Sequence, residues 1–428
     1  NCTRHLGPIV PGTTVENGAR VFGRSFELDP VKAAWDIGAI VRWLDFNDTW
    51  LAEEWGHPSD NLGAIMALSD YISRVNIANH KSPLSIKDVL EYMVKAHEIQ
   101  GILALENSFN KVGLDHVLLV RVASTAVATH MLGGNRDQII NALSQAWVDG
   151  SSLRTYRHAP NAGSRKSWAA GDATSRGVRL AMMTMAGEMG MPSVLTAPEW
   201  GFYDVSFKGR EFSFSRNYGS YVMENILFKI SYPAEFHAQT AVECAVILYP
   251  EVKDKLNKIE RIEITTHESA LRIIDKTGVL DNPADRDHCM QYMLAVAMIQ
   301  GDLVADFYED SFHQQNPLID VLRDKMVLKE DKRYSKDYLD DDKRSIANAL
   351  QVFFKDGSQT DKVEVEYPVG HHHRRQEGIP FLERKFLNSL QSIYSKECCD
   401  KIYTLCLDQN KIEQTPVNEF MDMFVVKD

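Results

Sequence analysis

A carboxylate, a hydroxyl and an imidazole occur close together in the segment WLDFNDTWLAEEWGHPSD, residues 43–60, where Asp45, Thr49 and His57 stand among three tryptophans. A pocket that transfers protons needs apolar walls to exclude water and a few convergent polar groups. The same residue types also cap helix ends, and His57-Pro58 is typical of a turn. The spacing alone leaves both interpretations open, a pocket wall or a capped helix end.

A second group of charged residues has the composition of an anion site. Residues 154–179 contain six cations and a single acid, Asp172, in a chain whose formal net charge is −12. Arg165 and Lys166 lie in a loop before an Ala-rich helix start, where backbone donors and the helix dipole add to their positive field. We interpret Arg176 and Arg179 as a solvated helix face. The segment therefore predicts that Arg165 and Lys166 bind a small polyanion.

A third segment, MENILFKISYPAEFHAQTAVECA (223–245), places Lys229 and His237 on either side of Tyr232-Pro233. Because Lys229 stands between two apolar residues, its ammonium could be partly desolvated and kept charged by an anion. A lysine that extends along an amphipathic surface toward water would have the same neighbours. Taken alone, the pattern favours this second interpretation.

Helical periodicity dominates the elements that must position these residues. Apolar residues recur every three to four positions in five segments, 30–44, 60–75, 85–99, 115–132 and 136–148. Short breaks that contain Gly, Pro, Asn or Ser divide them. The first half of the chain therefore predicts an all-helical domain.

Strand signals appear after about residue 200. We expect strands over 207–214 and 258–268, and a pair of strands within 349–368 around Asp356-Gly357. Helical segments persist at 235–249 and 286–299, and helical periodicity returns from 377 to 408. The fold class is thus mainly α with an inserted α+β domain, and the last segment should pack on the first domain.

Composition excludes several classes of protein. The 428 residues are 44% hydrophobic and 25% charged, which is typical of a globular protein, and no apolar run is long enough for a membrane helix. The negative net charge argues against nucleic-acid binding, which needs a basic face. The six cysteines, Cys2 among them, form no CxxC pair, so we expect reduced thiols and no iron–sulfur or zinc site.

Other residues suggest a metal or cofactor only superficially. His371, His372 and His373 are adjacent ligands with poor mutual geometry, so we expect a solvated loop. His97 lacks the second histidine of an HExxH motif, and no Gly-rich nucleotide fingerprint follows a strand. We therefore expect no metal and no cofactor. The acids of NPADRDHC, residues 282–289, could face a cleft, but capping of the next helix is the simpler role.

Long phrases of the chain resemble the MmgE/PrpD family, and the resemblance covers essentially the whole sequence. The sequence GLDHVLL at 113–119 favours the dehydratases of this family over its decarboxylases. The phrases that carry the resemblance are RWLDFNDTW, EWGHPSDN, KAHEIQG, LRTYRHAP, GSRKSWAAGDATSR, WGFYDVSFKG, SYVMENILFKISYPAEFHAQTA, NPADRDHC and VEYPVGH.

The resemblance implies a helical domain built from residues 1–224 and 367–428, with an α+β lid domain, 225–366, inserted between them. The site would lie between the two domains. Matched by motif, the expected catalytic residues are Asp45, His57, Lys166 and Lys229, and the expected substrate-binding residues are Thr49, Arg165, His237 and, as a weaker match, His116. The remaining polar residues of 43–60, Asn47, Asp48, Ser59 and Asp60, should hold the shape of the segment.

The implied activity is the elimination of water from 2-methylcitrate, a step of propionate catabolism. A base must remove a weakly acidic C–H proton, an acid must protonate the departing hydroxyl, and cations must hold the carboxylates. His57 is the expected proton-transfer residue because its ordinary pKa suits either role, with Asp45 as its partner. A cis-aconitate decarboxylase-like enzyme and a non-enzymatic tricarboxylate-binding protein are the alternatives.

The expected partner is therefore a small tricarboxylate, with no nucleic acid and no membrane. Such relatives tend to self-associate through the helical domain, so we expect a homodimer. The chain begins Asn1-Cys2 without an initiating Met, so we expect that it starts within a longer polypeptide whose targeting segment is out of view. The sequence is similar to fungal members of the family, which favours a location in the mitochondrial matrix. A bacterial source would instead imply the cytoplasm.

Overall fold

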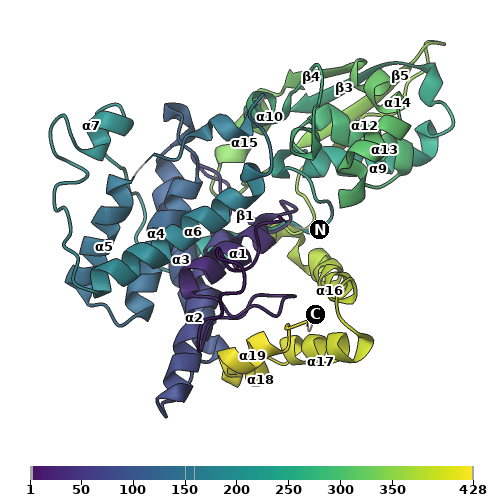
Figure 1. The fold of residues 1–428 in the computed structure, drawn as a ribbon. Helices are drawn as coiled ribbons and strands as arrows, with labels where there is room; N and C mark the ends of the chain where they lie inside the picture. The colour runs from purple at the N-terminus through teal and green to yellow at the C-terminus, as the bar shows by residue number, and fades with distance from the viewer. Residues whose placement is uncertain (1–2, 150, 159, 427–428) are drawn as a thin grey trace.

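The computed structural model describes residues 3–149, 151–158 and 160–426, so Cys2 lies outside the described residues. Within them the fold is mainly helical with two small sheets, as the sequence predicted (Figure 1). Six longer helices form the first part of the chain: α1 (Pro30–Arg42), α2 (Leu62–Ala78), α3 (Ile86–Glu106), α4 (Val117–Met131), α5 (Arg136–Val148) and α6 (Arg165–Met185). Their apolar faces share two buried clusters that include Ile37, Leu68, Leu118 and Val127.

Helix α1 begins where the Asp29 side chain accepts hydrogen bonds from the backbone N–H groups of Val31 and Lys32, with Pro30 in the first turn. It then packs against α6 at very short range. A Cβ on Gly38 would lie only 2.7 Å from the Cα of Gly171, so neither helix tolerates a side chain at this contact. The contact fixes the end of α1 relative to the start of α6, which carries Lys166.

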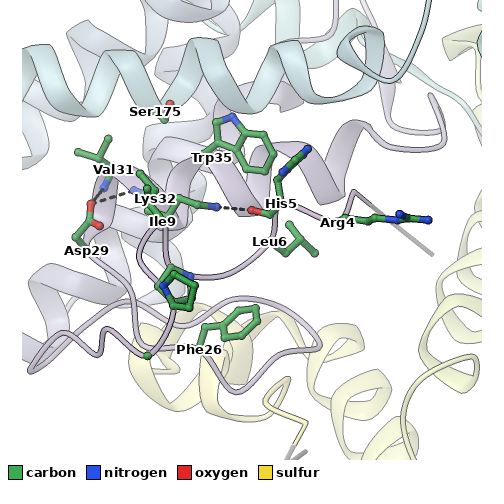
Figure 2. A pocket seen from close by; sticks show the side chains of 13 residues that line it. Arg4, His5, Leu6, Ile9, Phe26, Asp29, Val31, Lys32, Trp35 and Ser175 are labelled. Carbon is green, nitrogen blue, oxygen red and sulfur yellow. Dashed lines mark hydrogen bonds between the residues drawn. The ribbon is translucent and has the colours of Figure 1, made fainter.

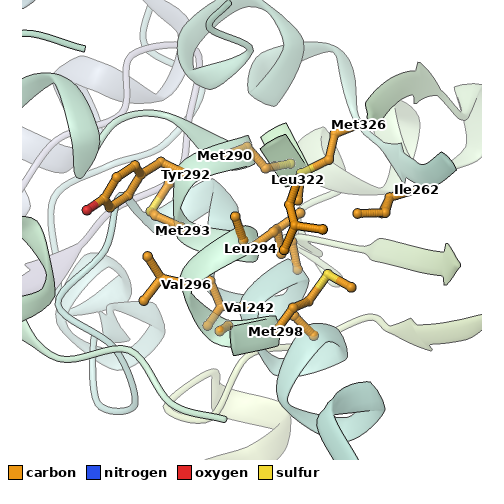
Figure 3. Packing of buried hydrophobic residues seen from close by; sticks show 14 of the residues in the cluster. Val242, Ile262, Met290, Tyr292, Met293, Leu294, Val296, Met298, Leu322 and Met326 are labelled. Atoms are coloured by element: carbon orange, nitrogen blue, oxygen red, sulfur yellow. The ribbon is translucent and has the colours of Figure 1, made fainter. Parts of the chain in front are cut away.

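The middle of the chain forms a four-stranded sheet of order β4-β3-β5-β6. Its strands are β3 (Ile259–Thr266), β4 (Met326–Glu330), β5 (Asn348–Phe354) and β6 (Val363–Val365). Strand β4 runs parallel to β3, whereas β3, β5 and β6 pair antiparallel in the register Ile262↔Val352 and Leu350↔Val363. Helices α9 (Gln239–Val252) and α12 (Met290–Gln300) pack on this sheet through a core of methionine and branched aliphatic side chains (Figure 3).

The C-terminal segment is helical, with α16 (Arg375–Gln391), α17 (Lys396–Leu407), α18 (Gln409–Gln414) and α19 (Val417–Asp422). Val417 and Met421 are buried in the cluster that contains Ile37 and Leu68. The backbone N–H of Val417 donates to the carbonyl of Leu84 at 2.9 Å. In Figure 1 the yellow helices accordingly lie beside α2.

A short ladder joins the beginning of the chain to the start of the middle part. Strand β1 (Asp48–Thr49) pairs antiparallel with β2 (Leu227–Phe228). The remaining helices are short: α7 (Phe202–Ser206), α8 (Tyr221–Asn225), α10 (Glu268–Ile274), α11 (Pro283–Arg286), α13 (Asp310–Gln315), α14 (Leu318–Arg323) and α15 (Lys332–Leu339). The β1–β2 ladder pairs Thr49 with Leu227 and Asp48 with Phe228, the residue before Lys229.

Most predicted elements occur within a few residues of their expected bounds, including the helix over 136–148, the strand within 258–268 and the strand pair around Asp356-Gly357. The strand predicted over 207–214 is wrong. Phe207 and Phe212 instead pack on Phe109 in an aromatic cluster, with ring centroids 5.1 and 5.7 Å away. These aromatic contacts, rather than a strand ladder, account for the aromatic residues Phe207 and Phe212 in this segment.

Candidate active site

Asp45 lies just after α1 and is buried against two cations. Its backbone φ is 50°, a left-handed conformation that aspartate tolerates. The guanidinium of Arg42 forms an ion pair with Oδ1, and the Nζ of Lys229 lies 3.3 Å from the same oxygen. The Nζ of Lys229 also donates to the Asp45 carbonyl at 2.6 Å. Burial alone would raise the pKa of Asp45, but these two charges outweigh it and hold the pKa well below its usual value.

His57 reaches the same place from the turn before the short 3-10 helix Pro58–Asn61. Its Nδ1 lies 2.5 Å from the carbonyl oxygen of Asp48, so Nδ1 carries the proton and donates it. Nε2 is then the unprotonated nitrogen, 4.0 Å from Asp45 Oδ1. Burial and the charge of Arg42 lower the His57 pKa well below its ordinary value, despite the opposing charge of Asp45. His57 is thus a neutral imidazole with a free basic nitrogen.

Thr49 Oγ1 lies 3.5 Å from His57 Nδ1, and the neighbouring polar residues hold this segment in shape. Asp48 accepts hydrogen bonds from the backbone N–H and the hydroxyl of Ser59, and its Oδ2 lies 3.1 Å from His97 Nε2. The Asn47 side chain donates to Ser59 at 2.9 Å and to Asp60 at 3.0 Å. The expectation that Asn47, Asp48 and Ser59 shape the segment is confirmed.

His116 packs against His57, with ring centroids 5.3 Å apart, at the start of α4. Both ring nitrogens of His116 and the Oδ2 of Asp60 are buried without a hydrogen-bond partner. The distance from His116 Nε2 to Asp60 Oδ2 is 4.0 Å. Burial raises the pKa of Asp60 to about 7, and it lowers that of His116 well below its ordinary value. Three unpaired polar atoms therefore lie next to the base, and a polar ligand could satisfy them.

Lys166 stands in the first turn of α6 and meets the loop after α11. Its Nζ forms an ion pair with Asp287 and lies 2.9 Å from His288 Nδ1. Burial lowers the pKa of Lys166 more than the charge of Asp287 raises it. This contact joins the helical part of the chain to the middle part.

Lys229 is positioned from two sides. The β1–β2 ladder holds the residue before it against Asp48, and the backbone N–H of Phe228 donates to the Gly370 carbonyl at 3.2 Å. From the C-terminal segment, Lys385 donates to the carbonyls of Phe46 and Lys229, both at 2.6 Å. Burial, with the charge of Lys229, lowers the pKa of Lys385 to about 7.

A cavity of about 440 Å³ opens beside Lys166, between the end of α1, the start of α6 and the loops of the middle part. Trp43, Ser164, Ser167, Asp287 and Tyr308 are among the residues that line it. Tyr308 is 5% exposed, and its hydroxyl is buried without a partner. Burial and the charge of Asp287 raise its pKa well above the usual value, so the phenol keeps its proton. The cavity is therefore large enough for a small ligand and has an unpaired hydroxyl in its wall.

The structure buries six of the predicted residues in one group, Asp45, Thr49, His57, His116, Lys166 and Lys229. None of the six lines the cavity, which adjoins the group through Asp287, the ion-pair partner of Lys166. His237 has no direct contact with this group among its hydrogen bonds. Its Nδ1 is 2.7 Å from Glu235 Oε1, and its Nε2 is 3.0 Å from the Tyr338 hydroxyl. Arg165 does not join the group. Its exposed guanidinium lies 4.4 Å from the ring centre of Trp168 and 3.7 Å from Asp172.

Sequence reasoning missed some of the residues at this site. Asp287 and His288 were considered for the cleft, but capping of the next helix by one of the acids was preferred. That preference is wrong, because α12 begins after Cys289 without a side-chain cap and Asp287 lines the cavity. Asp60 was assigned to shape, yet one of its oxygens is unpaired beside His116. Tyr308 and Lys385 carried no sequence signal, because only the tertiary structure brings them here.

Two features lie outside this group. A cavity of about 760 Å³ separates the N-terminal segment from α1, and it is lined by none of the eight predicted site residues (Figure 2). His371, His372 and His373 form the one group of three potential metal ligands in the described part of the chain, with ligand atoms within 4.8 Å of one another. The expectation of a solvated loop is wrong for His371, which is 0% exposed before a 3-10 turn, whereas His373 is exposed as expected.

None of the helices in the described part of the chain is long and apolar enough to cross a membrane. Comparison with known proteins matches residues 1–215 to the MmgE/PrpD N-terminal domain and residues 232–409 to the MmgE/PrpD C-terminal domain. The 2-methylcitrate dehydratase of Escherichia coli K12 is 60% identical over 428 residues, which cover 99% of this chain and 88% of that protein. The mitochondrial 2-methylcitrate dehydratase of Yarrowia lipolytica is 56% identical over 432 residues, or 100% of this chain and 82% of that protein.

Proposed function

The chain belongs to the MmgE/PrpD family, and we propose that it is a hydro-lyase that eliminates water from 2-methylcitrate to give 2-methyl-cis-aconitate. The observation that carries the proposal is the neutral, buried His57, whose free Nε2 faces a carboxylate among lysines and an arginine. This is the arrangement that removal of a proton from a tricarboxylate requires.

His57 is the proton-transfer residue. Its Nδ1–H is fixed by the Asp48 carbonyl, so Nε2 can accept the proton from the methyl-bearing carbon. The electron pair of the broken C–H bond forms the C=C bond, and the hydroxyl on the neighbouring carbon leaves with a second proton as water. Asp45 remains a carboxylate and stabilises the imidazolium that forms. A positioned general base of this kind contributes about 10²–10⁴-fold in rate.

Lys166 and Lys229 bind the substrate carboxylates and stabilise the negative charge of the enolate-like transition state. Both are buried, and burial lowers the pKa of each. A substrate carboxylate restores the preference for the charged form, because it adds an opposite charge at short range. Thr49 and His116 supply hydrogen bonds to the substrate. His237 and Arg165 have weaker support, because both ring nitrogens of His237 already have partners and Arg165 points away.

We also propose the domain arrangement 1–224, 225–366 and 367–428, with the middle segment as a lid over the helical domain. The separate buried clusters of the middle part and of the helical part support this division. A homodimer in the mitochondrial matrix, or in the cytoplasm for a bacterial source, completes the proposal. The mitochondrial location is supported by the name of the Yarrowia relative. Sedimentation equilibrium tests the dimer, and fractionation of source cells tests the subcellular location.

Activity is tested by incubating the purified protein with 2-methylcitrate, with and without a chelator, and following the products by mass. Loss of water at the same rate in both reactions is the expected result. Release of carbon dioxide from cis-aconitate without dehydration would instead indicate a decarboxylase, and no turnover would indicate a binding protein. His57→Gln should lower kcat by at least about 10²-fold with an unchanged circular dichroism spectrum.

A further inference from the structure

Arg121 on α4 is a buried cation with unused hydrogen-bond donors. Its side chain is 3% exposed, and NH1 lies 3.4 Å from the exposed carboxylate of Asp149. Its Nε and NH2 have no partner. A buried guanidinium with unpaired N–H groups is unfavourable unless an acceptor is supplied. Burial accordingly lowers its pKa to about 10, which still leaves it charged at neutral pH.

A cavity of about 230 Å³ lies directly at this residue. Its walls include two further guanidinium groups, those of Arg165 and Arg176, and three hydroxyl side chains, Ser151, Ser152 and Thr155. Val117, Tyr156, Ala169 and Ala173 supply the apolar part of the lining. The volume is smaller than that of a typical pocket for a drug-sized ligand, so it suits a molecule of a few heavy atoms.

The charges at this cavity leave a positive excess. Arg176 lies 3.2 Å from Asp172 and 2.9 Å from Asp149, and Arg165 is 3.7 Å from Asp172. Three guanidinium groups therefore share two carboxylates, both of which are partly exposed to water. The basic segment 154–179 is therefore divided in the structure, because Arg165 and Arg176 line this cavity whereas Lys166 is buried against Asp287.

We propose that this cavity binds a small oxyanion, a carboxylate or a phosphate, at a site distinct from the candidate active site. Guanidinium groups bind such anions through paired N–H donors, and the three hydroxyls add donors around the same volume. The site lies close behind the candidate active site, since Tyr156 lines it and donates to Asp115 at 3.0 Å. Asp115 in turn lies 3.4 Å from His116 Nδ1. The proposal does not depend on the identity of the substrate.

Titration calorimetry with inorganic phosphate and, separately, with acetate tests the proposal at constant ionic strength. Arg176→Gln removes one guanidinium from the cavity, and Arg179→Gln is the matched control, an exposed arginine on the same helix outside the cavity lining. Lys166→Ala identifies binding in the candidate active site, and acetate binding is measured in this background. Arg121→Met tests the buried guanidinium, with circular dichroism to verify its fold.

We expect saturable binding of at least one of the two anions, weakened at least tenfold by Arg176→Gln and unaffected by Arg179→Gln. Binding of phosphate alone identifies a phosphate-type ligand, and binding of acetate alone identifies a carboxylate. The proposal is overturned if neither anion binds saturably, if Arg176→Gln binds like Arg179→Gln, or if Lys166→Ala abolishes phosphate binding. The Arg176 result stands on its own if Arg121→Met fails to fold.

Discussion

Lys385 donates a hydrogen bond from Nζ to the backbone carbonyl of Lys229 at 2.6 Å. The same ammonium donates to the carbonyl of Phe46, next to Asp45, and lies 3.6 Å from the centre of the Phe46 ring. One side chain of α16 therefore ties together the backbones that carry two of the proposed catalytic residues. The C-terminal segment thus contributes to the geometry of the site without lining its cavity.

Replacing Lys385 with Met should displace both backbones while keeping the apolar stem. We expect kcat to fall by about 10–10²-fold, because small displacements of reacting groups are costly. Lys401→Met, on the exposed face of α17, is the matched control and should behave as wild type. Steady-state kinetics and thermal unfolding are measured on both. A Lys385→Met enzyme with normal kcat would show that the two carbonyl contacts do not position the site.

The pH dependence of the reaction should reflect the lowered pKa of His57. Burial and Arg42 keep its imidazole neutral at pH values where an ordinary histidine is half protonated. Activity requires the unprotonated Nε2, so it should fall only as pH drops below about 6.5. The acid limb of kcat/KM, recorded between about pH 5 and 9, locates this value. In Asp45→Asn the limb should move lower still, because the charge that raises the His57 pKa is gone. A limb above the ordinary histidine value contradicts the assignment.

Asp60 should make the protein less stable as pH rises. Burial raises its pKa from 3.8 to about 7, so the folded state favours the protonated acid. This contribution to stability is complete below the unfolded pKa and is lost as pH rises through the folded value. A shift of this size corresponds to about 4 kcal/mol at most.

Asp60→Asn keeps an acceptor for Asn47 and removes the titration. Its free energy of unfolding should therefore change less than that of wild type between about pH 4 and 7. Urea unfolding at several pH values measures the difference. Identical pH profiles for the two proteins would mean that Asp60 does not titrate in this range.

Gly370 occupies a position where a side chain has no room. Its φ is 104°, and a Cβ there would lie 2.0 Å from the carbonyl oxygen of Phe228. Gly357 in the β5–β6 connection is a control position, with a φ of 85° and open space around it. An alanine there meets the backbone strain of a positive φ but no steric clash. We expect Gly357→Ala to destabilise by about 1 kcal/mol and Gly370→Ala by several times more. Gly370→Ala should also lower kcat, because the clash would displace the backbone of Phe228 and with it the next residue, Lys229. Equal losses of stability in the two variants would argue against the clash.

The sequence predicted much of the site because its residues cluster in a few segments. Asp45, Thr49 and His57 could be grouped by proximity along the chain, although spacing alone left a capped helix end equally open. Lys229 was assigned through the family resemblance, because its apolar neighbours alone favoured a lysine that extends toward water. Arg165 and Lys166 were predicted to act together, but they diverge in the structure for a geometric reason. They are consecutive residues at the start of α6, and consecutive helical side chains point about 100° apart. Lys166 is therefore buried against Asp287, whereas Arg165 lies exposed beside Asp172.

Other parts of the site depend on distant segments and had no local signal. Tyr308 reaches the cavity only because the segment after α12 folds back beside Asp287. Strand β4 was not predicted, since its pairing with β3 joins residues more than sixty positions apart. In 207–214 the aromatic residues suggested a strand, but Phe207 and Phe212 pack on Phe109 and the segment has no partner strand among the described residues.

The ion pair between Lys166 and Asp287 has a consequence for how substrate enters. The two residues belong to different parts of the chain, so moving those parts away from each other leaves a buried lysine without its counter-ion. A carboxylate of the incoming substrate can replace Asp287 in this role, which makes substrate entry an exchange of counter-ions. Association should therefore be slowed by salts of small carboxylates such as acetate more than by chloride at equal ionic strength.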